Sequence, residues 1–322
     1  MQDTIYKNVE NLEPVILELL ETKAFKRLEY VSQLGVPKRY YEGIGFSRLE
    51  HSKGVFVLLR NLGASLEEQI AGLLHDISHM AFSHVIDHIY TNDVGDELLQ
   101  DLRHEKVMSE FDSSVILKRY GYNPTKLAQM DLYNLLDRPI PYLCADRIDY
   151  SLRQFPLKES KRFAKSLILK DGRIVFNGKD SAKEFAILFL NEYATNWGTF
   201  WNLGKYTLMA GMLREGIKEE IICEEDLWQP ENWILEKLLN SGNQKIQTIH
   251  SILSSGRDAM NSLPVTGDKS RKKFRYVDPE FLDKGKILIL SNVDSEFNQL
   301  VEEERKKNAH GIETPDIDKL LR

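Results

Sequence analysis

Two consecutive segments with helical spacing of apolar residues constrain the fold of this chain most strongly. The first, residues 47–63, opens on Ser47 with a glutamate three positions later and ends at Gly63, which suits a capped helix. The second, residues 65–75, opens with the same serine and glutamate spacing. We therefore predict two capped helices in sequence, each with one apolar face.

Helical patterns continue through most of the chain, including a long one over residues 181–213. Short β-prone runs interrupt them around Asp171-Gly172, where a hairpin is expected, and again in KKFRYVDP and KILIL, which we expect to pair as strands. The prediction is a mostly α fold with a small β-hairpin insertion and a mixed α/β C-terminal extension. We expect two domains, a core over residues 1–205 and an extension over residues 206–322 that packs on it.

Composition argues against several classes of protein. With 42% hydrophobic and 29% charged residues among 322, the chain is expected to be neither disordered nor a membrane protein. The net charge of −6 supplies no overall basic field, so nucleic acid is not expected as a partner. Two cysteines are too few for a disulfide framework or a thiolate zinc finger. Without a signal region at its start or an apolar run of about 18 residues, we expect a cytoplasmic protein.

Histidines are concentrated in one part of the chain. Six of the eight lie between His51 and His104, and four of these fall within HDISHMAFSHVIDH. Any one of them, taken alone, fits a polar helix face or a hydrogen-bonded core position. Taken together they indicate a site, because several potential cations are unfavourable side by side unless a metal or an anion compensates.

Side chains from three separated segments can be assembled into a metal sphere. His51 shares the apolar stripe of the first helix and should point inward. His75 and Asp76 are adjacent, so both reach one ion only if the second helix ends or distorts there. ADRIDY, in which Asp146 and Asp149 share a helical face, supplies a distant carboxylate. Such a mixture of imidazoles and carboxylates fits one divalent transition metal, with iron, manganese, nickel, cobalt and zinc all left open.

The ordered runs RLEHSKGV, AGLLHDISHMAFSH, RHE and ADRIDYSLR resemble the HD-domain phosphohydrolases. The resemblance covers residues 25–155 and continues more loosely to 205, and it is strongest to the deoxynucleoside triphosphate triphosphohydrolases. It implies the helical HD fold. It also implies that His51, His75 and Asp76 hold one divalent metal together with Asp146.

The resemblance also assigns catalytic roles. It implies that His79 and His84 face the phosphates, and that Asp87 and His104 form an acid–histidine pair for proton transfer. A carboxylate beside His104 would raise the pKa of that imidazole and suit it to protonate a leaving oxygen. The implied attack is on the α-phosphorus, releasing nucleoside and triphosphate, and Mg²⁺ is a further candidate companion of the substrate phosphates.

Four other positions match residues that contact substrate in the family. Gln33 is implied to lie near the sugar, Arg48 to bind phosphate, Arg147 to stand beside the metal aspartate, and Tyr150 to face the sugar ring. Surface solvation remains an alternative for the two arginines, and core packing for the tyrosine. The chain departs from the family at Gln154, where an aspartate is usual.

The cations available for three phosphates are few in this sequence. Besides Arg48 and Arg147, only Arg153 and Lys205 are candidates, the latter in EYATNWGTFWNLGK, where the family usually has an arginine and a tyrosine. The run DKSRKKFRY could bind a phosphate effector but is more typical of a solvated strand edge. The aromatic group that includes Trp197 and Tyr206 is expected in the core or in a subunit interface rather than against a base.

We conclude from the sequence that the chain is a metal-dependent phosphohydrolase acting on nucleotides, with dNTP triphosphohydrolase as the leading activity. A nucleoside monophosphate phosphatase, or a hydrolase of another phosphorylated small molecule, is the enzymatic alternative. A nucleotide-binding sensor without turnover is the alternative of another class. The resemblance also implies a homo-oligomer.

Overall fold

A computed structural model of the chain describes residues 1–90 and 98–321. The first half is built from helices that pack around one hydrophobic core. In chain order these are α1 (Pro14–Glu21), α2 (Lys23–Lys26), α3 (Arg48–Leu62), α4 (Leu66–Leu74), α5 (Asp87–Tyr90), α6 (Leu98–Glu110), α7 (Asp112–Arg119), α8 (Pro124–Leu127), α9 (Ala145–Leu152) and α10 (Leu157–Ser166). The predicted mostly α fold is confirmed.

Helices α3 and α4 begin where the capping signals predicted. The Ser47 side chain accepts a hydrogen bond from the Glu50 backbone, and the Glu50 carboxylate accepts one from the Ser47 backbone N–H. Gly63 ends α3 in the left-handed conformation at φ 79°. The two helices approach closely at Gly72, where a Cβ would lie 2.4 Å from Leu59. This close packing sets the position of the turn that follows α4.

The second half adds further helices and two small sheets. The helices are α11 (Lys179–Glu192), α12 (Phe200–Lys218), α13 (Glu231–Leu239), α14 (Gln244–Ser254), α15 (Arg257–Asn261), α16 (Leu290–Val293), α17 (Ser295–Ala309) and α18 (Ile317–Leu320). The strands are β1 (Leu167–Lys170), β2 (Arg173–Phe176), β3 (Val265–Ser270), β4 (Glu280–Asp283), β5 (Lys286–Ile289) and β6 (Ile312–Pro315). None of the helices in the described part of the chain is both long and apolar enough to cross a bilayer.

The larger sheet has the order β1-β2-β4-β5, with β2 and β4 parallel and the other pairs antiparallel. Strands β3 and β6 form a separate antiparallel pair. The predicted hairpin is present between β1 and β2, with positive φ at both Asp171 and Gly172 as its two-residue turn requires.

Two sequence predictions of elements were wrong. KKFRYVDP is not a strand: KILIL contributes to β5, whose partner is β4, and residues 271–279 run without a ladder. In this segment the Asp278 N–H donates to the carbonyl of Pro141 instead of to a neighbouring strand. The helical pattern over 181–213 is also broken, because a π-helical turn at Tyr193–Trp197 separates α11 from α12.

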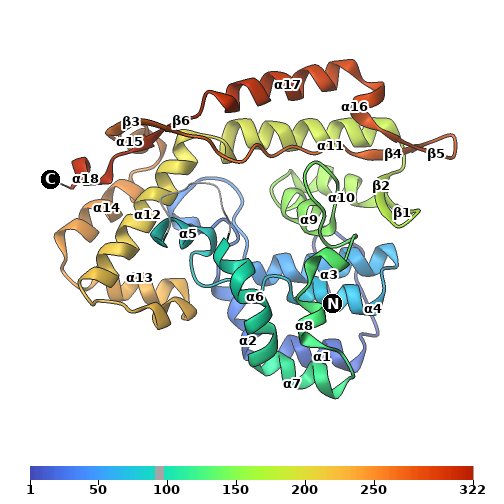
Figure 1. Cartoon of the computed structure of the whole chain (residues 1–322), viewed down its shortest axis with the longest axis horizontal. Helices are drawn as coiled ribbons and strands as arrows, with labels where there is room; N and C mark the ends of the chain where they lie inside the picture. Colours follow the sequence, from blue (N-terminus) through green and yellow to red (C-terminus); the bar gives the residue numbers. More distant parts are fainter. Residues whose placement is uncertain (91–97, 322) are drawn as a thin grey trace.

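Two hydrophobic clusters organise the molecule. The larger one joins α1, α3, α4, α9, α10 and α11, whereas the smaller one joins α12, α13 and α14 with residues 80–86. In Figure 1, α11 and α17 run side by side along one edge, and α12 to α14 lie to one side with α5 next to α12. Helices α1 to α4 and α6 to α8 lie below. Residues 75–88 connect the clusters, and the site described next lies along them. The division into domains at residue 205 stays a prediction.

Candidate metal centre and active site

A cavity of about 1100 Å³ opens between the two clusters. It brings together all but one of the residues expected at the site: Gln33, Arg48, His75, Asp76, His79, His84, Asp87, His104, Asp146, Arg147 and Tyr150 all line it. The remaining one, His51, is fully buried and contacts Asp146 and His75 from behind the cavity wall. Sequence reasoning therefore placed residues from positions 33 to 150 in one cavity.

Local structure explains how the two adjacent residues His75 and Asp76 face one point. Helix α4 ends at Leu74, His75 is its C-cap, and a turn follows. Helix α3 carries His51, and α9 carries Asp146 in its first turn. The expectation that α4 ends at this histidine is confirmed.

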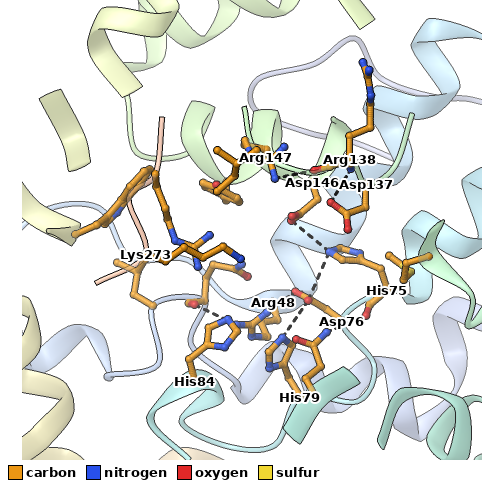
Figure 2. A pocket seen from close by; sticks show the side chains of 18 of the residues that line it. Arg48, His75, Asp76, His79, His84, Asp137, Arg138, Asp146, Arg147 and Lys273 are labelled. Atoms are coloured by element: carbon orange, nitrogen blue, oxygen red, sulfur yellow. Dashed lines mark hydrogen bonds and ion pairs between the residues drawn. The ribbon is translucent and has the colours of Figure 1, made fainter. Parts of the chain in front are cut away.

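Four donor atoms converge at this point, and Figure 2 shows the side chains of His75, Asp76 and Asp146 that supply three of them. The Nε2 atoms of His51 and His75 lie 3.2 Å apart. Asp146 Oδ1 is 2.9 Å from His51 Nε2 and 3.6 Å from His75 Nε2. Asp76 Oδ1 is 3.5 Å from His75 Nε2. His51, His75 and Asp76 each offer one donor atom, and these three atoms lie within 4.8 Å of one another, close enough to share a metal ion.

The hydrogen bonds of the two imidazoles show that this donor set fits a cation. His75 Nδ1 lies 2.8 Å from the carbonyl of Gly72, and His51 Nδ1 lies 2.8 Å from Asp149. Both Nδ1 atoms therefore carry a proton, and once the Nε2 atoms are deprotonated their lone pairs face the same point. Burial would lower the pKa of His51, but Asp146 and Asp149 outweigh it and raise that pKa to about 9. The surroundings thus favour positive charge at this point, as a metal would supply.

A buried ion-pair chain holds His51 in place. Asp149 accepts from Arg153 Nε at 2.7 Å, and Arg153 also bonds Asp3 at 2.7 Å. Gly54 permits this approach of α9 to α3, because a Cβ there would lie 2.1 Å from the Asp149 carboxylate. Arg153 is therefore committed to the support of the metal centre, and its proposed role as a phosphate ligand is wrong.

Arg48 is more deeply buried than a phosphate ligand at the surface would be, with 2% of its area exposed. Its guanidinium lies 2.8 Å from Asp76 and 2.6 Å from Ser83 Oγ, and it reaches the carbonyl of Gln33 at 3.3 Å. Burial opposes ionisation of Asp76, but Arg48 together with His75 and His79 outweighs it and holds the pKa of that carboxyl well below its usual range. Arg48 thus keeps a metal ligand ionised, and its contact with phosphate stays a prediction.

The expected catalytic residues share the cavity but pair differently from the prediction. Asp87 lies 3.5 Å from His84 Nδ1, whereas His104 Nδ1 lies 3.0 Å from Ser78 Oγ. Burial, assisted by His75, lowers the pKa of His104 to about 4, so the expected rise in the pKa of this imidazole is wrong for the metal-free protein. Burial and Arg48 also hold the pKa of His79 well below its usual value. Both imidazoles are therefore neutral at neutral pH.

Aromatic side chains form the wall beyond Asp146. The rings of Tyr150 and Trp197 meet edge to face at 5.7 Å, and the Trp197 indole donates to Gln154 at 3.1 Å. All three residues line the cavity, as does Tyr206. Trp197 and Tyr206 also pack against the hydrophobic clusters, as expected for this aromatic group. Arg147 donates to the carbonyls of Tyr142 and Arg138 and thereby holds the loop before α9.

Sequence reasoning missed a group of cations that the C-terminal half contributes. Lys272, Lys273 and Arg275 line the cavity, and Lys273 lies across it from His75 and Asp146 (Figure 2). The signal was present in DKSRKKFRY, but no local pattern says which cavity such a segment faces. Lys205, which the sequence offered instead, lies beneath the rings of Tyr41 and Trp201 and does not line the cavity.

Comparison with known proteins agrees with this site. The HD domain family matches residues 48–153, the segment that contains His51, His75, Asp76 and Asp146. The uncharacterized protein YdhJ of Bacillus subtilis is 30% identical over 319 residues, which span 97% of each chain. The metal-dependent phosphohydrolase cns2 of Cordyceps militaris is 39% identical over 153 residues, or 48% of this chain and 44% of cns2.

Similarity to enzymes named for a nucleotide substrate covers a shorter part of the chain. The deoxynucleoside triphosphate triphosphohydrolase SAMHD1 of Bos taurus is 34% identical over 102 residues, which are 27% of this chain and 17% of SAMHD1. A phosphohydrolase from Bacteroides thetaiotaomicron has the same fold, with a TM-score of 0.62 at 17% identity over 93% of this chain and 96% of the other. This chain belongs to the HD-domain family of metal-dependent phosphohydrolases.

Proposed function

We propose that this HD-domain phosphohydrolase acts on nucleotides and cleaves deoxynucleoside triphosphates to nucleoside and triphosphate. The observation that carries the proposal is the composition of one cavity. It combines the metal donor set, an aromatic wall at Tyr150 and Trp197, and cations on the far side from the metal donors. A volume of about 1100 Å³ is large for a phosphate group alone and accommodates a whole nucleotide.

His51, His75, Asp76 and Asp146 would hold the metal, which lowers the pKa of bound water and polarises a phosphoryl oxygen. His79, neutral because of burial and Arg48, offers a hydrogen bond to a phosphate beside these ligands. Water adds to the α-phosphorus, the bond from phosphorus to the nucleoside 5′ oxygen breaks, and that oxygen takes up a proton. We assign the proton to His104, whose low pKa a bound phosphate anion would raise.

A nucleoside monophosphate phosphatase is the second candidate. The observation that favours it is the commitment of Arg48 and Arg147 to groups of the protein, which leaves few cations beside the metal donors. Gln154 stands where the family usually has an aspartate, and its side chain accepts a hydrogen bond from Trp197. Recognition of a deoxyribose is therefore left to other groups.

Product analysis tests the proposal. The protein is loaded in turn with manganese, iron, cobalt, nickel or zinc, incubated with nucleoside mono-, di- and triphosphates, and the products are separated by phosphate chain length. Intact triphosphate from a dNTP is the expected result. Orthophosphate released from monophosphates alone would support the second candidate, and no hydrolysis with any metal would support a sensor.

A further inference from the structure

Residues 272–276 border the cavity as a segment without regular secondary structure and with two different faces. Phe274 and Tyr276 stack at 5.3 Å, and the guanidinium of Arg305, from α17, covers both rings. Arg275, which lies between them in sequence, lines the cavity together with Lys272 and Lys273. The aromatic face thus fixes the segment on α17 while the basic face is turned to the site.

The backbone of the segment is fixed as well. Asn308 of α17 donates to the carbonyl of Lys272 at 3.0 Å, and Tyr193 donates to Asn308 at 2.6 Å. The Lys272 ammonium in turn donates to the carbonyl of Trp197 at 3.0 Å. A segment held at both its rings and its backbone presents its cations in a defined position, which reduces the entropy lost when a ligand binds.

Among the described residues, no carboxylate balances the charge of the two lysines of this segment. Within residues 1–90 and 98–321, neither Lys272 nor Lys273 lies within ion-pair distance of an aspartate or glutamate. Burial, with Lys205 and Arg275, lowers the pKa of Lys272 to about 7. Placing cations together at a cavity wall is unfavourable unless an anion binds between them.

We propose that Lys272, Lys273 and Arg275 form an anion subsite that holds the phosphates beyond the one at the metal centre. The inference rests on the proposed function and deepens it, because such a subsite selects polyphosphate esters over monophosphates. Lysine ammonium groups suit the outer oxygens of a polyphosphate, where charge counts more than planar geometry. The subsite comes from a segment at residues 272–275, outside the matched HD domain at residues 48–153.

A polyphosphate fits these observations better than nucleic acid. The three cations line one cavity with the metal donors, and Lys273 faces His75 and Asp146 across it (Figure 2). The net charge of the chain is −6, which disfavours association with a large polyanion away from the cavity. Lys269 and Arg271, next to the segment, are exposed and do not line the cavity.

Direct binding tests the subsite without requiring turnover. Binding of inorganic triphosphate to the metal-loaded protein is measured by calorimetry for wild type, Lys273→Ala, Lys273→Arg and the control Lys269→Ala. Lys273 is exposed to the cavity, so its replacement should not disturb folding. We expect Lys273→Ala to weaken binding by about ten- to 100-fold, as for loss of one charged hydrogen bond. Lys273→Arg and Lys269→Ala should bind like wild type.

Kinetics separate the subsite from the proposed reaction. If dNTPs are substrates, Lys273→Ala should raise KM for a triphosphate by a similar factor and leave KM for the corresponding monophosphate unchanged. If dNTPs are not hydrolysed but triphosphate binding still depends on Lys273, the proposed function fails and the subsite stands. Equal triphosphate binding by wild type and Lys273→Ala, or no binding by wild type, would overturn the subsite.

Discussion

Asp149 does not line the cavity, yet it determines which nitrogen of His51 carries the proton. Its carboxylate accepts from His51 Nδ1 and from Arg153, and it is fully buried. Because the proton is held on Nδ1, the lone pair of Nε2 faces His75 and Asp146. A residue that hydrogen-bonds a metal ligand from behind orients that ligand and thereby contributes to metal affinity.

We therefore predict that Asp149→Asn weakens metal binding by about 10- to 100-fold, as reported generally for groups that orient metal ligands. The amide keeps the shape but loses the charge that favours the Nδ1-protonated imidazole. Competition with a chelator of known affinity measures the change. Asp131→Asn, at an exposed position on the cavity rim, is the control. Equal metal affinity of Asp149→Asn and wild type would contradict the orienting role.

His104 makes the stability of the metal-free protein depend on pH. Its pKa is lowered to about 4 in the folded chain by burial, whereas an unfolded chain protonates histidine near pH 6.5. The neutral form is favoured by folding, so this contribution is present above about pH 6.5 and is lost as pH falls toward 4. Between these values wild type should lose about 3 kcal/mol more free energy of unfolding than His104→Gln. Denaturant titrations at several pH values test this, and parallel losses in the two proteins would refute it.

Among the elements, α13 acts on the site from a distance. Glu231 at its start accepts from the backbone of Ser32 and of Phe82, both at 2.9 Å, and from the Ser32 hydroxyl at 2.5 Å. Phe82 has a φ of 64°, an uncommon conformation for a residue with a side chain. Glu231 thereby joins the loop before Gln33 to the turn before His84.

Removal of this carboxylate should loosen both loops. Glu231→Ala leaves two buried N–H groups without an acceptor, and we expect it to lower the free energy of unfolding by about 2–4 kcal/mol. Glu231→Gln retains an acceptor for those N–H groups and should restore most of the stability and the wild-type KM. Glu236→Ala, on the exposed face of the same helix, is the control. If Glu231→Ala raises KM no more than Glu236→Ala does, the link to the site is wrong.

Sequence patterns predicted elements where the cause is local. The capping pairs at Ser47 and Ser65 act within one helical turn, so both helix starts were correct. The segment KKFRYVDP has the composition of a strand, but its backbone and side chains are satisfied by Pro141, α17 and the cavity wall. Such distant partners are set by the tertiary fold and leave no periodic signal in the sequence.

Residues of the site also differ in whether the sequence around them shows their role. His51, His75 and Asp146 were predictable because unusual residue types recur in an order that a family shares. Asp3 and Glu231, whose partners lie 150 and up to 199 positions away, carry no local feature that separates them from surface carboxylates. The catalytic assignments of His79, His84, Asp87 and His104 stay predictions, as does the homo-oligomer.

In the molecule as a whole, the cavity depends on both hydrophobic clusters. The larger cluster supplies the helices that carry the metal donors, and the smaller one supplies α12 and α13, which position the opposite loops. The C-terminal segment then closes one side with Lys272 and Lys273. The site therefore requires the fold of the whole chain and extends beyond the part that matches the HD domain.

Metal content measured by mass spectrometry tests the central claim that His51, His75, Asp76 and Asp146 share one metal ion. Wild type, Asp146→Ala and the control Asp137→Ala are exposed to manganese, iron or zinc and freed of unbound metal. Asp137 lines the same cavity, and with Cys144 and Asp146 it forms a second group of possible metal ligands. Its replacement therefore shows which of the two groups holds the ion. We predict one tightly held ion per chain in wild type and Asp137→Ala and none in Asp146→Ala. Full metal retention by Asp146→Ala would contradict the claim.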